Sequence, residues 1–394
     1  MSVLIKDNTN KHKALFYIIL LLSFFMPHSS VIGQSIAGVL PFVLFIISWR
    51  YRRFKLNNYS LAILLIIITS FTINVIAGEI NEFKDFFRLL SFCSLFLLFP
   101  FTHYFKVPLV LLYIALGFIF ISQIAYAVGV NPLVVFFDTY FPYEGETVGF
   151  TSDFLQKGAG EIDFVTKRRY GGIYHNPNQA VKYVSVLFLV YLIEAHKKKL
   201  ITQLPFIIMS LSSVLLSGSR TGFIVIFVLW GTSLVIYNKI YRIVLPLLIG
   251  FFFMSILIFT ISNQTSSNLR IFDVVSGFDG SIGTKMDWFL IFFSQLESPI
   301  KFLFGHFSTG SIYNYGLILL DSEWGELFYC FGFVGFILVG NFYLSLYRTE
   351  DKNIRLFLLI LLWGVSSTIL FSFRMSFIFM FFLSNYYSLY LSKK

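Results

Sequence analysis

The feature that most constrains the fold is a series of long, unbroken apolar runs. One of them, residues 107–128, carries no charged side chain over its whole length. A helix needs about 20 apolar residues to cross the hydrocarbon core of a bilayer. The runs lack the alternation of apolar and polar residues that is typical of membrane barrel strands. Because backbone polar groups in lipid must be paired within the protein, such runs predict a bundle of membrane-spanning helices.

The charge content agrees with that prediction. Charged residues make up 13% of the chain, about half the share in a soluble domain. The net charge of +10 is interpreted as a membrane-orienting excess of Lys and Arg, so no nucleic-acid partner is expected. The two cysteines, Cys93 and Cys330, both lie in apolar runs. They are predicted to be buried thiols and to form neither a disulfide nor a metal site.

The sequence predicts an all-α fold, a polytopic membrane helix bundle of about twelve transmembrane helices. We treat residues 1–394 as a single integral membrane domain. The first run is interpreted as an uncleaved span, because no small-residue cleavage site follows it. The predicted spans are 14–32, 36–49, 59–78, 86–100, 107–128, 178–194, 200–216, 221–237, 243–262, 322–347, 356–372 and 375–391.

The distribution of basic residues orients these spans. With the N-terminus in the cytoplasm, the inner loops hold more than half of the 30 Lys and Arg residues, as the positive-inside rule requires. An even number of spans then returns the C-terminus to the cytoplasm as well. The short outer loops hold only four basic residues, Lys84, Arg88, Arg220 and Arg374.

Two long connections, residues 129–177 and 263–321, fall on the outer side. Loops of this length without clear structure of their own are usually functional or disordered. The second contains residues 283–298, whose mixed polar and apolar pattern predicts an interfacial helix on the outer leaflet.

The first polar cluster is the stretch RRYGGIYHNPNQA, residues 168–180, at the start of a predicted span. Gly172 permits a close approach of the backbone, and Lys182 lies on the same helix face as Asn178. A helix start with basic residues around it favours an anion; the alternative is a basic anchor at the membrane surface with a helix cap. The candidate residues here are Arg168, Arg169, Gly172, Tyr174, Asn176, Asn178 and Lys182.

The second cluster is SGSRTG, residues 217–222, a very short outer turn. Its glycines permit a tight hairpin, and its Ser219 or Thr221 hydroxyl can cap the next helix. Arg220 opposes the positive-inside bias, and an arginine at a helix start suits bidentate binding of phosphate or carboxylate. The alternative is an arginine that reaches the membrane surface from a helix end.

The third cluster closes the second long loop. Asp321 and Glu323 stand at the start of the span predicted at 322–347, and His306 precedes them in the sequence FGHF. These residues are candidates for proton transfer. The alternative is that the acidic residues only cap the helix and interact with its dipole, as acidic residues in a first helical turn ordinarily do.

Several classes of enzyme are excluded by what the sequence lacks. It contains no P-loop, GxSxG, HExxH or GxGxxG motif, and its histidines show no metal-binding spacing. The inner loops are too short for a nucleotide-binding domain. We therefore expect no metal and no cofactor, and we expect any chemistry to use a pre-activated, lipid-borne substrate at the outer face.

The three clusters, in this order, resemble the O-antigen polymerase and ligase family of bacteria. The resemblance covers roughly residues 130–340 and the overall span count. It implies an inner-membrane glycosyltransferase that acts on undecaprenyl-diphosphate-linked glycans at the periplasmic face, among membrane lipids. A polymerase transfers the growing glycan onto the next lipid-linked repeat, and a ligase transfers it to lipid A-core. A chain-length regulator and a flippase of the same pathway are the protein partners that this implies.

The resemblance also implies roles for single residues. Arg169 and Arg220 match arginines expected to hold the diphosphate, with Arg168 an equally close match for the first. In ligases, a His followed by Asn or Ser typically opens the span after the long loop. Asp321 and Ser322 stand there in this chain, a departure that favours the polymerase.

The expected chemistry follows from these residues. Arg220, Arg169 and Lys182 would neutralise the charge on the departing diphosphate. One of Asp321, Glu323 and His306 would accept the proton of the acceptor hydroxyl. Tyrosines of the first loop, including Tyr174, offer flat faces to sugar rings.

Two other classes of protein remain as alternatives. A transporter, for example a flippase of lipid-linked sugars, would show internal repeats and polar sites at the membrane midplane, and the sequence shows neither. A membrane scaffold that only binds anionic lipid would leave the outer Arg220 unexplained.

Overall fold

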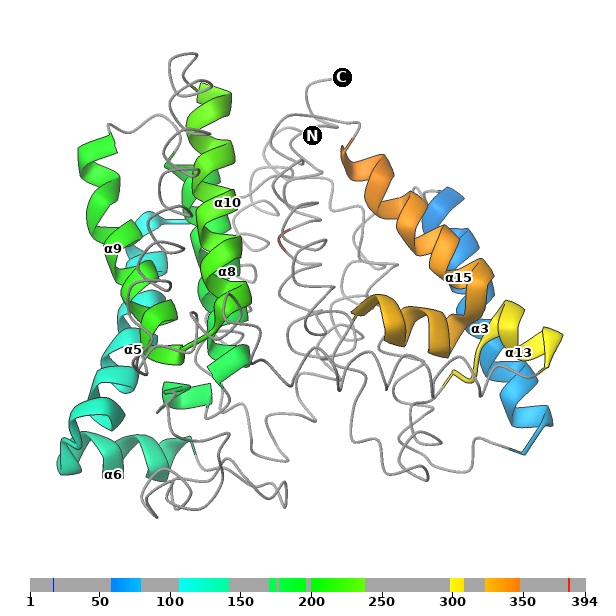
Figure 1. Ribbon diagram of the computed structural model, residues 1–394, viewed down its shortest axis with the longest axis horizontal. Coiled ribbons are helices and arrows are strands. Elements are labelled where there is room, and N and C mark those ends of the chain that lie inside the picture. Colours follow the sequence, from blue (N-terminus) through cyan, green and yellow to red (C-terminus); the bar gives the residue numbers. More distant parts are fainter. Residues whose placement is uncertain are drawn as a thin grey trace, which may run out of the picture.

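A computed structural model describes Tyr17, residues 58–78, 106–141, 170–174, 177–195, 200–237, 298–307 and 323–347, and Phe382. Every regular element within these ranges is a helix, and none of the described residues forms a strand (Figure 1). The elements are α3 (Asn58–Ile76), α5 (Leu109–Val128), α6 (Asn131–Tyr140), the 3-10 helix η2 (Gly172–Tyr174), α8 (Pro177–Glu194), α9 (Leu200–Ser217), α10 (Arg220–Tyr237), α13 (Pro299–Phe304) and α15 (Glu323–Tyr347).

The observed helices confirm the all-α prediction in the described ranges. α3, α5, α8, α9 and α10 begin and end within about three residues of predicted spans, the usual uncertainty of helix boundaries. α5 is long and apolar enough to cross a membrane, judged by length and composition. The spans predicted at 14–32, 36–49, 86–100, 243–262, 356–372 and 375–391 lie outside the described residues, apart from Tyr17 and Phe382, as does the helix predicted at 283–298.

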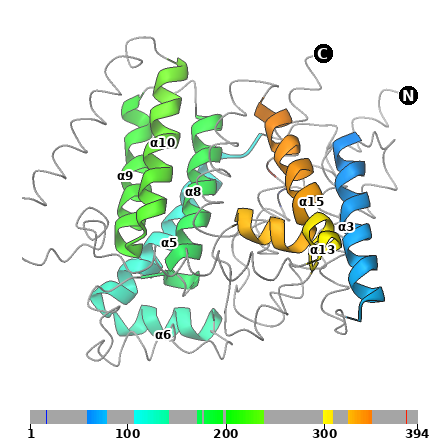
Figure 2. The ribbon, with the colours of Figure 1, turned by 45° about the vertical axis from the view of Figure 1, so that its right-hand side comes forward.

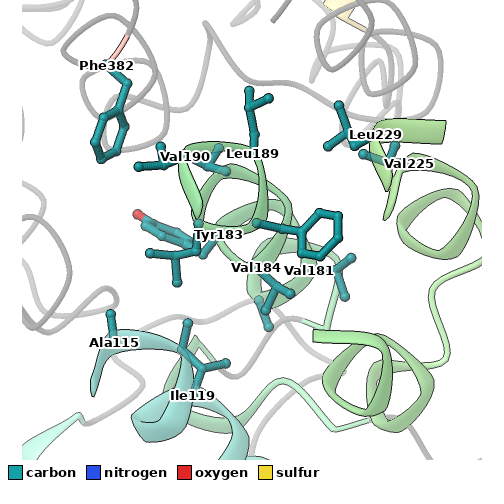
Figure 3. Packing of buried hydrophobic residues seen from close by; sticks show 14 of the residues in the cluster. Ala115, Ile119, Val181, Tyr183, Val184, Leu189, Val190, Val225, Leu229 and Phe382 are labelled. Carbon is teal, nitrogen blue, oxygen red and sulfur yellow. The ribbon is translucent and has the colours of Figure 1, made fainter. Parts of the chain in front are cut away.

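α8 is the central helix of the region formed by α5, η2, α8, α9 and α10. Its residues from Ala180 to Ile193 are all buried, because the helix presents apolar side chains around its whole circumference. It packs against α9, α10 and α5. Figure 3 shows side chains of α8 between Ala115 and Ile119 of α5 and Val225 and Leu229 of α10.

α6 lies across the end of α5 (Figure 2). The chain turns at Gly129, whose φ of 75° and ψ of 40° form the left-handed cap typical of helix ends. The Tyr126 hydroxyl of α5 donates a hydrogen bond of 2.6 Å to Asp138 of α6, and Phe137 packs edge-on against Phe118. The connection predicted at 129–177 therefore contains helices of its own, α6 and η2.

α15 corrects the prediction of one continuous span at 322–347. Gly332, with φ of 64° and ψ of −170°, interrupts the helix, and Figure 1 shows the ribbon of α15 changing direction along its length. Only glycine readily adopts this conformation. A methyl group at Gly332 would collide with the backbone of Leu303 and Phe304, so the break admits the end of α13. Cys330, beside the break, is buried, as predicted.

Candidate functional site

The glycine pair of the first cluster brings the chain against α5. Gly172 has φ of 60°, and a methyl group there would collide with the Ser122 hydroxyl. The Ser122 hydroxyl accepts a 3.1 Å hydrogen bond from the Ile173 amide. The Gln123 side chain donates one of 3.1 Å to the Tyr170 carbonyl. The close approach predicted for Gly172 is therefore made to the C-terminal half of α5.

The same stretch is hydrogen-bonded to α9, next to the second cluster. The Tyr170 amide donates a 3.0 Å hydrogen bond to the Leu216 carbonyl. The Ser213 hydroxyl donates one of 2.5 Å to the Gln123 carboxamide oxygen. Tyr170 directly follows Arg169 in the chain, and Leu216 is four residues before Arg220. The backbone thus brings the two arginine-containing segments to the same end of the helix bundle.

The SGSRTG turn forms the predicted hairpin and helix cap. Gly218 has φ of 60° and its amide bonds to the Leu215 carbonyl. The Ser219 hydroxyl accepts a 3.3 Å hydrogen bond from the Gly222 amide, the bond that an N-cap residue makes to the third helical residue. Of the two hydroxyls proposed for the cap, Ser219 therefore makes it, and Arg220 is the first residue of α10.

Gly222 brings the starts of α8 and α10 together. A methyl group at Gly222 would collide with the Val181 side chain, and both residues lie near the beginning of their helices. The two helix N-termini therefore point toward the same end of the bundle. Each N-terminus carries positive partial charge on backbone amides, so two such ends side by side form a favourable place for an anion.

At each of the two neighbouring helix C-termini, those of α5 and α9, one carbonyl accepts a hydrogen bond from outside the helix. The Ala125 carbonyl of α5 accepts bonds from the Gly129 and Val130 amides, and the Leu216 carbonyl of α9 accepts one from Tyr170. Lys182, in the second turn of α8, is only 4% exposed. Lys182 is thus a basic side chain of the first cluster that is buried close to the place where the two helices begin.

The structure describes the remaining first-cluster residues only in part. Asn178 lies in the first turn of α8 and is half-buried. Tyr174 is 4% exposed, and its ring stacks on Tyr183 at 4.2 Å with 10° between the planes. One ring face of Tyr174 is thus occupied by Tyr183 in this arrangement. Arg168, Arg169 and Asn176 lie outside the described residues, as does the side chain of Arg220.

His306 belongs to a different group of helices. It follows α13, its amide donates a 2.7 Å hydrogen bond to the Tyr329 carbonyl, and its ring stacks on Tyr329 at 4.6 Å. α13 and α15 pack mainly against each other and α3, on the other side of the molecule from α8–α10 in both views (Figures 1 and 2). Glu323 is the first residue of α15; its side chain and Asp321 are not described.

Sequence reasoning missed the polar residues inside the apolar runs. Ser122, Gln123, Ser70 and Asn74 are each fully buried within helices predicted as generic spans. Polar side chains within such runs are rare and often functional, and this signal was present in the sequence. No group of three or more His, Cys, Asp or Glu that could hold a metal occurs among the described residues.

Comparison with protein-family models, with curated proteins and with solved structures gives no match.

Proposed function

We propose that the protein is a glycosyltransferase of the bacterial inner membrane that polymerises undecaprenyl-diphosphate-linked oligosaccharide repeats at the periplasmic face. The growing glycan moves en bloc onto the next lipid-linked repeat, and undecaprenyl diphosphate is released. The proposal joins the family resemblance of the three polar clusters to the arrangement of helix starts at one end of the bundle. A chain-length regulator and a flippase would act beside it.

The outward faces of the helices support a membrane environment. Large apolar side chains stand exposed along α3, α5 and α9, among them Leu65, Ile114 and Ile208, each more than half exposed. Lipid solvates such exposed apolar side chains, as it does on the outer faces of a membrane helix bundle. α5 is apolar and long enough to be one span. The proposed topology has twelve spans, with both termini in the cytoplasm.

The observation that carries the proposed chemistry is the meeting of the two arginine-containing segments. The Tyr170–Leu216 hydrogen bond and the close contact of Gly222 with Val181 support a single anion site formed by the starts of α8 and α10. We expect Arg220, together with Arg169 or Arg168, to complete this site. Arginine binds phosphate oxygens with two parallel hydrogen bonds, which suits a diphosphate headgroup.

In the proposed reaction, the acceptor hydroxyl attacks the anomeric carbon of the donor glycan. The new glycosidic bond forms as the bond from that carbon to the phosphate oxygen breaks, and the electron pair leaves with undecaprenyl diphosphate. Arg220, Arg169 and Lys182 stabilise the departing negative charge. Asp321, Glu323 or His306 accepts the hydroxyl proton. Direct attack predicts inversion at the anomeric carbon.

One observation favours a second candidate, a transporter of lipid-linked sugars. α15 is discontinuous at Gly332, and broken helices are common in secondary transporters. Purified protein in detergent distinguishes the two, because detergent provides no second side for transport. A polymerase lengthens lipid-linked repeats there, whereas a transporter leaves them unchanged. The ligase alternative is distinguished by its acceptor: its deletion removes all glycan from lipid A-core, whereas deletion of the polymerase leaves a single repeat.

Replacement of Arg220 tests the anion site. We expect Arg220→Ala to abolish long surface glycan while single repeats remain, and Arg220→Lys to restore little, because lysine lacks the bidentate geometry. Loss of one such contact typically lowers turnover about 100-fold or more. Thr232→Val is the matched control on α10, since that hydroxyl bonds only to its own helix's Val228 and Leu229 carbonyls. Wild-type glycan length in both Arg220 variants would rule out the diphosphate role.

A further inference from the structure

A buried polar cluster lies between α5 and α9, near the C-terminal ends of both helices. Its members, Ser122 and Gln123 of α5 and Ser213 of α9, are fully buried. The two helices pack against each other, and the Ser213 hydroxyl donates a 2.5 Å hydrogen bond to the Gln123 carboxamide oxygen. Polar side chains inside apolar helices of a membrane protein are rare and commonly functional. The cluster therefore calls for a role beyond apolar packing.

The partners of the Gln123 carboxamide fix its orientation. A backbone carbonyl can only accept a hydrogen bond, so the nitrogen of the carboxamide must face the Tyr170 carbonyl. It donates to that carbonyl at 3.1 Å, and the carboxamide oxygen accepts from Ser213. These two partners are 47 and 90 residues away in the sequence. Gln123 thus joins α5 both to α9 and to the segment that leads into η2.

Tyr170 is held on both sides of its own backbone. Its amide donates a 3.0 Å hydrogen bond to the Leu216 carbonyl of α9, and its carbonyl accepts from Gln123 of α5. Three residues later, the Ile173 amide donates to the Ser122 hydroxyl. The segment is therefore bonded to two different helices, which fixes the direction of the chain at Tyr170 as well as its position.

Fixing Tyr170 also limits the place of Arg169, because consecutive Cα atoms are about 3.8 Å apart. From Tyr170 the chain runs through η2 to Pro177, the first residue of α8. Leu216, the partner of the Tyr170 amide, precedes the short turn that ends at Arg220, the first residue of α10. The hydrogen bonds around Tyr170 therefore tie the basic part of the first cluster to the starts of both helices.

We propose that Gln123 is a positioning residue for the lipid diphosphate. Gln123 is fully buried and acts through the chain that it holds, so that Arg169 or Arg168 completes the anion site at the starts of α8 and α10. This rests on the proposed function, in which these arginines bind the diphosphate of the lipid-linked donor. Bidentate binding of phosphate requires a guanidinium in a defined orientation, and supporting residues maintain such an orientation.

The test measures binding of undecaprenyl diphosphate to the purified full-length protein in detergent. Gln123→Met keeps the approximate size of the side chain but removes the amide donor and the carboxamide oxygen. Ser213→Ala removes only the bond to that oxygen. Ser210→Ala is the matched control, because Ser210 is equally buried on α9 and its hydroxyl donates to the Phe206 carbonyl of its own helix.

We expect the dissociation constant to rise about tenfold in Gln123→Met, as for the loss of a buried hydrogen bond. It should rise about threefold in Ser213→Ala, where the bond to Tyr170 remains, and stay unchanged in Ser210→Ala. Wild-type affinity in a folded Gln123→Met variant would overturn the positioning role. Should Gln123→Met not fold, equal affinities in Ser213→Ala and Ser210→Ala would overturn it.

A double-mutant cycle separates positioning from general support of the fold. Because Gln123 is proposed to act through the arginines of the first cluster, Gln123→Met should have no further effect on binding in the Arg168→Ala/Arg169→Ala background. It should keep its effect in the Arg220→Ala background. Equal fold-changes in the two backgrounds would contradict the proposal, since a residue that only supports the fold weakens binding alike in both.

Chain extension with lipid-linked repeats, measured on the same proteins, separates this proposal from the polymerase itself. Extension by the wild-type protein, with unchanged diphosphate binding in Gln123→Met, would overturn the positioning role and leave the polymerase intact. No extension by the wild-type protein, with diphosphate binding that depends on Gln123, would refute the polymerase. The anion site and its positioning residue would then stand.

Discussion

The region around α8 and the region around α15 both depend on glycine, but they use it to make different contacts. At Gly172 and Gly222 the missing side chain makes room for the side chains of Ser122 and Val181. At Gly305 and Gly332 it makes room for the backbone of Cys330 and Tyr329, and of Leu303 and Phe304. In the first region unbroken helices pack against one another. In the second, carbonyls of the broken helix α15 accept hydrogen bonds from the amides of His306 and Phe307.

This difference predicts unequal tolerance to change. A side chain can rotate or be shortened, whereas a backbone that is hydrogen-bonded on both sides cannot move away without losing those bonds. The α15 region should therefore be the more rigid of the two and the less able to accept substitution. The α8 region derives its order from apolar packing around one buried helix, which relaxes more gradually.

The largest expected effect is that of Gly332→Ala. The new methyl group would collide with the Leu303 and Phe304 backbone, and φ of 64° with ψ of −170° is essentially restricted to glycine. Strain and overpacking together should destabilise the protein by more than about 3 kcal/mol. Gly340→Ala, on the same helix with open space around it, should not destabilise it. Thermal unfolding followed by gel filtration checks both; equal melting temperatures would show that the break in α15 is absent.

An intermediate effect is expected for Gly222→Ala. The methyl group would meet the Val181 side chain, not backbone, at a cost of about 1–3 kcal/mol. Shortening the neighbour in Gly222→Ala/Val181→Ala should recover part of the loss, and a double-mutant cycle measures this coupling. Gly117→Ala, which meets nothing within 4 Å on α5, is the control. Strictly additive effects would contradict the close packing of α8 on α10.

The smallest effect expected is that of Ser219→Ala, which removes the cap of α10 at a cost of about 1 kcal/mol. Ser219→Asp sharpens the comparison, because aspartate caps as well as serine but places a negative charge at the helix start. We expect Ser219→Asp to keep wild-type stability and to raise KM for the lipid diphosphate. An unchanged KM would place the anion away from the start of α10.

Sequence reasoning succeeded where the signal was local. The helices α3, α5, α8, α9 and α10, the hairpin at Gly218 and the serine cap of α10 all follow from nearby residues. It failed for α15, because the apolar run around Gly332 is compatible with a continuous helix. The glycine conformation becomes necessary only when α13 approaches. The prediction that Arg169 and Arg220 bind one diphosphate remains a prediction.

The sequence by itself determined that the described chain is helical, and where α3, α5, α8, α9 and α10 begin and end. The reason is that each helix satisfies its backbone hydrogen bonds within one segment. Only the tertiary structure decided which buried polar groups pair. Ser70 bonds to a carbonyl 260 residues away and Ser213 to a side chain 90 residues away. No local pattern encodes those partners, because they are selected by the packing of segments that the chain brings together from a distance.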